Sequence, residues 1–156
     1  MKIIQKCITI IFTTALLVCT GCQMKDPALS DSLQTIMDKL YKDIPEDQLP
    51  MALEDVQLNE DNEAYFLGSD KIEYAEGLAR EPAVSSIAYS VVLLRVKEDV
   101  DVEALVKKIQ SSVDPAKWVC VEAESVIVES RGDVILVVMA DQDQASTISK
   151  AFEDLQ

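Results

Sequence analysis

Apolar side chains recur every three to four residues in three segments, which is the spacing of an amphipathic helix. The first segment begins at Asp31 and ends before Pro45, because proline cannot continue a helix. Its apolar positions are Leu33, Ile36, Met37, Leu40, Tyr41 and Ile44. The other two segments, 102–113 and 142–155, follow aspartates suited to cap a helix start. We expect three helices with one apolar side each.

The strongest strand pattern covers 86–97, where apolar residues occupy both faces, as in a central strand covered on both sides. Two β-branched runs, 125–129 and 134–140, are separated by four residues that include Gly132. Because glycine readily adopts a positive φ, this spacing predicts a hairpin.

The pattern is weaker between residues 46 and 82. We expect 46–62 to be an acidic loop with one helical turn near 51–56. Residues 64–67 predict a short strand, and 71–80 a short helix that ends at Glu81-Pro82. Together the elements predict a single α+β domain over 31–156, with an antiparallel or mixed sheet of about four strands and helices packed mainly on one face.

The first 21 residues have the layout of a secretory signal peptide, and 22–30 read as a polar tether. Lys2 and Lys6 form a positive start, and an uncharged, mostly apolar run covers 7–18. This run is short for a membrane-spanning helix, which needs about 20 predominantly apolar residues.

Residues 19–22, Cys-Thr-Gly-Cys, resemble the lipobox of bacterial lipoproteins. The resemblance implies that Cys22 receives a diacylglyceryl group and that a peptidase cleaves between Gly21 and Cys22. Cys19 departs from the pattern, since leucine is usual there. Two acyl chains hold a protein stably on a bilayer, so we expect a lipid-anchored protein on the extracytoplasmic face of the cell membrane. An ordinary secretory signal or an uncleaved anchor are the alternatives.

Composition excludes several classes of function. The chain has 14 Lys+Arg against 28 Asp+Glu, a net charge of −14, and this argues against nucleic acid as a partner. Removing residues 1–21, which hold two lysines and no acid, leaves −16 over 135 residues. The chain has no histidine, which removes histidine-based catalysis and zinc sites with imidazole ligands. We expect no cofactor and no metal site.

Few residues of the domain are candidates for chemistry. Cys120 is the one thiol left after signal removal and lipidation, and its valine neighbours predict a small buried side chain. Tyr89 and Trp118 are candidates for ligand contact, although a core position is the alternative for both. The acidic run 99–103 predicts a helix cap rather than a calcium loop, and 60–63 a solvated loop.

Two segments, 81–91 and 114–121, carry a family likeness. With the lipobox before them and the hairpin and last helix after them, the chain resembles a family of small uncharacterised lipoproteins from Gram-positive anaerobes, known as a domain of unknown function. The resemblance implies a cell-envelope location and no particular activity.

The sequence therefore favours a non-catalytic binding or interaction module of the cell envelope. One alternative is a small hydrolase that uses paired carboxylates, which requires two acids at a set separation in a cleft. Another is a partner for a further envelope protein, which a contiguous exposed apolar patch would favour.

Overall fold

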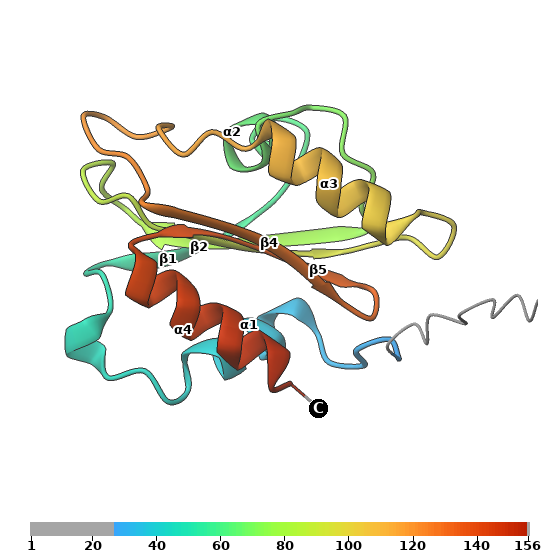
Figure 1. Ribbon diagram of the computed structural model, residues 1–156, viewed down its shortest axis with the longest axis horizontal. Coiled ribbons are helices and arrows are strands. Elements are labelled where there is room, and N and C mark those ends of the chain that lie inside the picture. The colour runs from blue at the N-terminus through green and yellow to red at the C-terminus, as the bar shows by residue number, and fades with distance from the viewer. Residues whose placement is uncertain (1–26, 156) are drawn as a thin grey trace, which may run out of the picture.

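Five strands form one antiparallel sheet in the computed structural model, which describes residues 27–155 (Figure 1). The strand order is β1-β2-β3-β5-β4. The strands are β1 (Leu53–Gln57), β2 (Glu76–Pro82), β3 (Ser90–Arg95), β4 (Ser125–Arg131) and β5 (Val134–Ala140). The predicted α+β class is confirmed, with five strands in place of about four.

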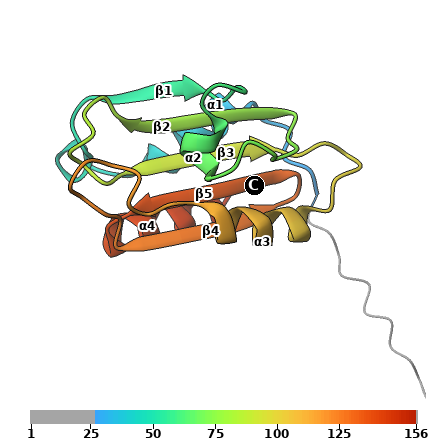
Figure 2. The ribbon, with the colours of Figure 1, turned by 90° about the horizontal axis from the view of Figure 1, so that it is seen from above.

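Helices cover both faces of the sheet, so the expectation that they pack mainly on one face is wrong. One face carries α1 (Leu33–Tyr41) and α4 (Gln142–Glu153), and the other carries α2 (Glu63–Leu67) and α3 (Val102–Ser112) (Figures 1 and 2). A short 3₁₀ helix, η1 (Glu46–Gln48), follows α1.

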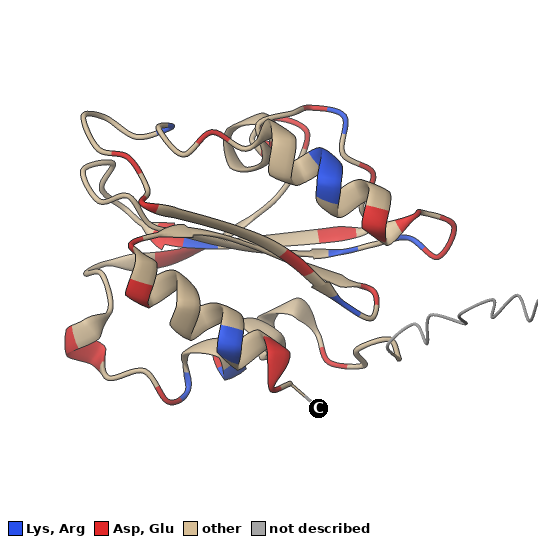
Figure 3. Ribbon diagram, viewed as in Figure 1, with Lys and Arg blue, Asp and Glu red and all other residues tan. Residues whose placement is uncertain are grey.

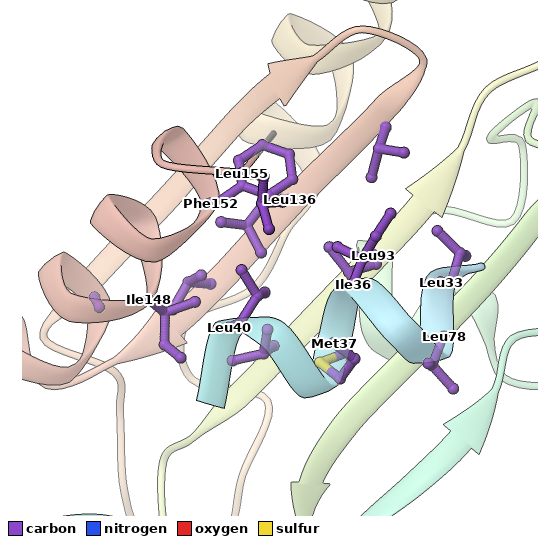
Figure 4. Packing of buried hydrophobic residues seen from close by; sticks show 14 of the residues in the cluster. Leu33, Ile36, Met37, Leu40, Leu78, Leu93, Leu136, Ile148, Phe152 and Leu155 are labelled. Atoms are coloured by element: carbon purple, nitrogen blue, oxygen red, sulfur yellow. The ribbon is translucent and has the colours of Figure 1, made fainter. Parts of the chain in front are cut away.

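The two central strands explain this arrangement, because both of their faces are apolar. All seven residues of β5 are buried, as are five of the six residues of β3. Val91 and Leu93 of β3 pack with α1 and α4, whereas Val92 and Leu94 pack with α2 and α3. Figure 4 shows Leu93 beside Ile36 of α1. A strand that is apolar on both faces needs a layer of helices on each side.

The three long helices and the hairpin are confirmed. Ser32, Asp101 and Asp141 cap α1, α3 and α4, and each side chain accepts a hydrogen bond from a backbone N–H of the first turn. Asp101 shows that the acidic run 99–103 serves as a helix cap. Gly132, in the β4–β5 turn, has φ +59°.

Three elements between residues 46 and 82 differ from the sequence prediction. Residues 53–57 form the edge strand β1, where a loop with a helical turn was expected. Residues 64–67 belong to the helix α2, where a strand was expected, and the expected helix at 71–80 overlaps β2. β2 is paired on both sides, by β1 and β3, and such long-range pairing overrides weak local preference.

The N-terminal signal, Gly21 and Cys22 lie outside the described residues. Of the expected tether, 27–30 are described, and Leu29 packs against the core between the sheet and α1 and α4. Within residues 27–155, no helix is long and apolar enough to cross a membrane.

Candidate functional site

A groove opens at the end of the sheet where β3 begins and β5 ends. It consists of two adjoining hollows of about 480 Å³ and about 400 Å³. Both hollows are lined by Gln48, Leu49, Glu124, Asp141 and Gln144. We call the two hollows together the acidic groove.

Three segments of the chain meet at the groove: η1, the loop at 122–124 and the start of α4. Pro45 precedes η1, whose last residue Gln48 forms one wall. The start of α4 forms the opposite wall, where Asp141 caps the helix. Gln144 Nε2 donates a hydrogen bond of 3.1 Å to the carbonyl oxygen of Gln48, so the two walls are joined directly.

The groove carries negative charge. Its lining includes five carboxylates: Asp47, Glu122, Glu124, Asp141 and Asp143. Among the described residues that line it, none is lysine or arginine. Acidic positions outnumber basic ones over the whole ribbon (Figure 3), but here they surround a hollow. Such a site attracts cations and disfavours anions.

Tyr89, one of the two residues predicted to contact a ligand, lies beneath the groove. It lines the larger hollow, yet it is only 1% exposed. Its hydroxyl group lies 2.8 Å from that of Tyr41, and burial raises the pKa of Tyr89 to about 12. Tyr89 therefore contributes a neutral, largely apolar floor.

An ion-pair cluster supports this tyrosine pair from the side of β2. The Arg80 guanidinium lies 4.7 Å from the ring centre of Tyr41. It donates two hydrogen bonds to Asp55, of 2.5 and 2.7 Å, and one of 3.0 Å to Asp38. The hydrogen bond from Arg80 lowers the pKa of the Asp55 carboxyl group. The cluster joins α1 to β1 and β2, and none of its three charged residues lines either hollow.

Trp118, the other predicted contact residue, does not line the groove. It is 7% exposed and packs with Ala123 and Met139 in a separate apolar cluster. The structure thus places Tyr89 at the groove and Trp118 in the core, so these two residues do not form one site.

Next to Trp118, a buried lysine is surrounded by aromatic rings. The Lys117 Nζ lies 4.1, 4.6 and 4.9 Å from the ring centres of Tyr65, Phe66 and Trp118. It donates hydrogen bonds of 3.1 Å to Glu81 and 3.2 Å to Ser90. Burial lowers the pKa of Lys117, while Glu81 acts in the opposite direction.

Ser90 and Lys117 are the two residue types that serve as nucleophile and base in a Ser–Lys hydrolase, but their surroundings do not suit catalysis. A substrate must reach the serine oxygen, but Ser90 is 0% exposed and the Lys117 side chain only 4%. Glu81 is also placed to keep the ammonium group charged, which opposes a role as base. The cluster therefore connects the 113–124 loop to β2 and α2.

Cys120 is exposed, so the prediction of a small buried side chain is wrong. Its φ of +63° places it in a turn of the 113–124 loop. Val119, which precedes it in the chain, is also 65% exposed, despite its apolar side chain.

Exposed apolar side chains continue from the groove across this end of the molecule. Met51 is 81% exposed and Val84 is 49% exposed. Backbone hydrogen bonds hold their loops together, from Ala83 N to Ala52 O and from Val119 N to Ser85 O. We call Met51, Val84 and Val119 the apolar rim.

Sequence patterns did not single out the carboxylates of the groove. Asp141 fits the pattern of a helix cap, and Asp47 lies in the segment 46–62 that the sequence predicts to be an acidic loop. No pattern in the sequence distinguishes Glu122 or Glu124. Their common site brings Asp47 next to carboxylates that lie about 75 to 95 residues further along the chain, and no local pattern encodes that.

No family model, curated protein or solved structure matches the chain.

Proposed function

We propose that this protein is a lipid-anchored extracytoplasmic binding module, held on the membrane through Cys22, whose acidic groove takes a cationic organic ligand. The observation that carries the ligand class is the set of five carboxylates around one groove, with no lysine or arginine among its described lining residues. Its kinship with the small lipoproteins from Gram-positive anaerobes is part of the same proposal.

The N-terminal pattern supports the anchor. Lys2 and Lys6, the apolar run and the ending Thr20-Gly21-Cys22 together match a lipoprotein signal. Signal removal leaves Cys120 and Cys22 as the only cysteines, so a lipidated domain would have no disulfide. The two apolar cores on either side of the sheet supply stability instead.

The groove supports a small or narrow ligand with both charge and apolar surface. Its larger hollow, about 480 Å³, falls within the range of ligand pockets. Ile44, Leu49 and Ile148 line it beside the carboxylates. A protonated amine on an apolar body would use both kinds of surface, and a basic peptide side chain has the same chemistry.

The anchor is tested by the mass of the N-terminal peptide. We expect the native protein in the membrane fraction to begin at a lipid-modified Cys22, and Cys22→Ala to leave that fraction or retain its signal. A soluble protein with an unmodified N-terminus would show secretion instead. A membrane-bound protein that begins at Met1 would show an uncleaved anchor.

Ligand class is tested by calorimetry on the full-length protein in detergent, with the amidated tripeptide Lys-Phe-Lys and with spermidine as probes. The double variant Glu124→Gln, Asp141→Asn removes two groove charges, and asparagine preserves the cap of α4. Each carboxylate contributes about 1 kcal/mol to a cation about 4 Å away in water, so we expect affinity to fall about tenfold or more.

The matched control is Glu98→Gln, Asp99→Asn, which removes the same charge from an exposed loop at the opposite end of the sheet. Affinity should change little in the control. Equal losses in both double variants would mean that the net charge, rather than the groove, attracts the probes.

A paired-carboxylate hydrolase is a second candidate, because Glu124 and Asp141 line both hollows of the same groove. Glycosidases place two carboxyl groups about 5 to 9.5 Å apart across the scissile bond. Turnover of a nitrophenyl glycoside, abolished by Glu124→Gln or Asp141→Asn alone, would favour this candidate. Binding without turnover would favour the module.

A further inference from the structure

The start of the described chain is fastened to the β4–β5 turn. The backbone N–H of Leu29 donates a 2.9 Å hydrogen bond to Asp133. Arg95 donates to the carbonyl oxygens of Leu29 and Asp31, at 2.8 and 2.5 Å, and its guanidinium pairs with Asp133 at 2.5 Å. We call these four residues the N-terminal clasp.

Packing reinforces the clasp. The side chains of Arg95 and Asp133 are only 21% and 27% exposed, so water competes weakly for their bonds. Leu29 packs against the core, and Pro27 contacts Gly132 so closely that a Cβ on this glycine would overlap the Pro27 carbonyl group. Residues 27–31 therefore belong to the folded domain and do not behave as a free linker.

The clasp limits how far the domain can lie from a lipid on Cys22. Five residues lead from Cys22 to Pro27, and a fully extended chain of that length spans at most about 18 Å. A tether that were free up to Ser32 would have twice as many residues and would leave the orientation of the domain open.

The acidic groove lies at the other end of the sheet. β5 begins at Val134, next to Asp133 of the clasp, and ends at Ala140, next to Asp141 of the groove. Seven strand residues cover about 24 Å. The first described residues (blue in Figures 1 and 2) lie beside the β4–β5 turn in both views.

We propose that the N-terminal clasp orients the domain on the bilayer, with the β4–β5 turn toward the lipid surface and the acidic groove directed away from it. The inference rests on the lipid anchor of the proposed function. The groove and the apolar rim then face a ligand or partner that arrives from the extracytoplasmic side, and a lipid headgroup of the same bilayer is out of reach.

Electrostatic attraction does not supply this orientation. Around the clasp, five acids outnumber three cations: Asp31, Glu98, Asp99, Asp101 and Asp133 against Arg95, Lys97 and Arg131. The groove at the opposite end is acidic as well. An anionic bilayer repels both ends. The clasp is therefore the feature that distinguishes them.

The test measures energy transfer from a label on the protein to acceptor headgroups in vesicles of phosphatidylcholine and phosphatidylglycerol. The full-length lipidated protein carries Cys120→Ser and one new cysteine, either Ser130→Cys near the clasp or Ser85→Cys near the groove, both at exposed positions. Because the ends differ by about 24 Å, we expect the rate of transfer from position 130 to exceed that from position 85 about threefold or more.

Arg95→Met removes the charged donor of the clasp and should bring the two transfer rates together. Lys97→Met removes a charge from an exposed position two residues further along and should leave the difference intact. Circular dichroism checks that both variants fold. Should Arg95→Met fail to fold, Asp133→Ala removes the other side of the clasp and serves the same comparison.

Three results are distinguishable. A difference in the parent that Arg95→Met or Asp133→Ala abolishes supports the orientation. Protein that floats with the vesicles but transfers equally from both positions overturns the orientation and leaves the anchor standing. Protein that does not float overturns the lipid anchor, and the orientation with it.

Discussion

At the scale of residues, the buried tyrosines and the buried lysine near the groove end make contacts that hold the fold together. The hydroxyl groups of Tyr41 and Tyr89 form a hydrogen bond beneath the groove, and the Arg80 guanidinium lies over the ring of Tyr41. Lys117 is buried among three aromatic rings with Glu81 as its counter-charge. These contacts determine how the loops at the groove end are held.

The tyrosine pair predicts a loss of stability at alkaline pH. Tyr89 ionises near its ordinary pKa of 10 in the unfolded chain and at about 12 in the folded protein. Its contribution to the free energy of unfolding is complete below pH 10 and is lost as the pH rises to 12. We expect the stability of the wild type relative to Tyr89→Phe to fall by roughly 2–3 kcal/mol across this range.

Urea unfolding of both proteins at several pH values measures this difference. Lys117, whose lowered pKa acts in the opposite direction at pH values below its ordinary 10.5, is present in both proteins and cancels. A difference in stability that stays constant with pH would contradict the prediction.

At the scale of elements, caps and turns agree with local sequence, whereas the weak elements depend on their neighbours. Ser32, Asp101 and Asp141 each cap the helix that follows. β1, in contrast, has an acidic, half-exposed sequence that reads as a loop, and it exists because β2 pairs with it. The β4–β5 turn combines both cases, since Gly132 suits the turn and also leaves space for Pro27.

Gly132→Ala should destabilise the protein by about 1–2 kcal/mol from the left-handed backbone alone. The added Cβ should cost more, because it displaces Pro27. Gly132→Asn tolerates the backbone better but retains the Cβ. Chemical denaturation of the two variants therefore separates the cost of the left-handed backbone from the cost of the overlap with Pro27. A Gly132→Asn variant as stable as the wild type would show that the contact with Pro27 contributes nothing.

At the scale of the whole molecule, charge opposes folding. The chain has twice as many acidic as basic residues, and the described part holds five ion pairs to offset their repulsion. The two apolar cores must overcome this repulsion. The same excess of acidic residues lines the groove. The negative charge that would attract a cationic ligand therefore also destabilises the folded state.

Raising the ionic strength from about 10 mM to about 150 mM shortens the screening length from about 30 Å to about 8 Å. We expect the free energy of unfolding to rise with sodium chloride over this range. The Glu98→Gln, Asp99→Asn control should be more stable than the wild type at low salt and should gain less from salt. A stability that falls with salt would mean that the five ion pairs outweigh the repulsion.

The sequence by itself determined the features that depend on near neighbours in the chain. Helical spacing identified α1, α3 and α4, and β-branched runs around Gly132 identified the hairpin. Aspartate caps marked the starts of α3 and α4, whereas for α1 the sequence pointed to Asp31 and the cap is Ser32. The apolar character of both faces of β3 identified it as a central strand. The lipobox pattern at Gly21 and Cys22 is likewise local, and it remains a prediction because those residues lie outside the described part.

Only the tertiary structure decided the features that join distant segments. The acidic groove unites loops near residues 48, 124 and 141, and the clasp joins Leu29 to Arg95 and Asp133. β1 and β2 became strands, and α2 a helix, because of the surfaces against which they pack. The physical reason is that periodicity records which side of an element is apolar, whereas the partner that covers that side is selected by the free energy of the whole fold.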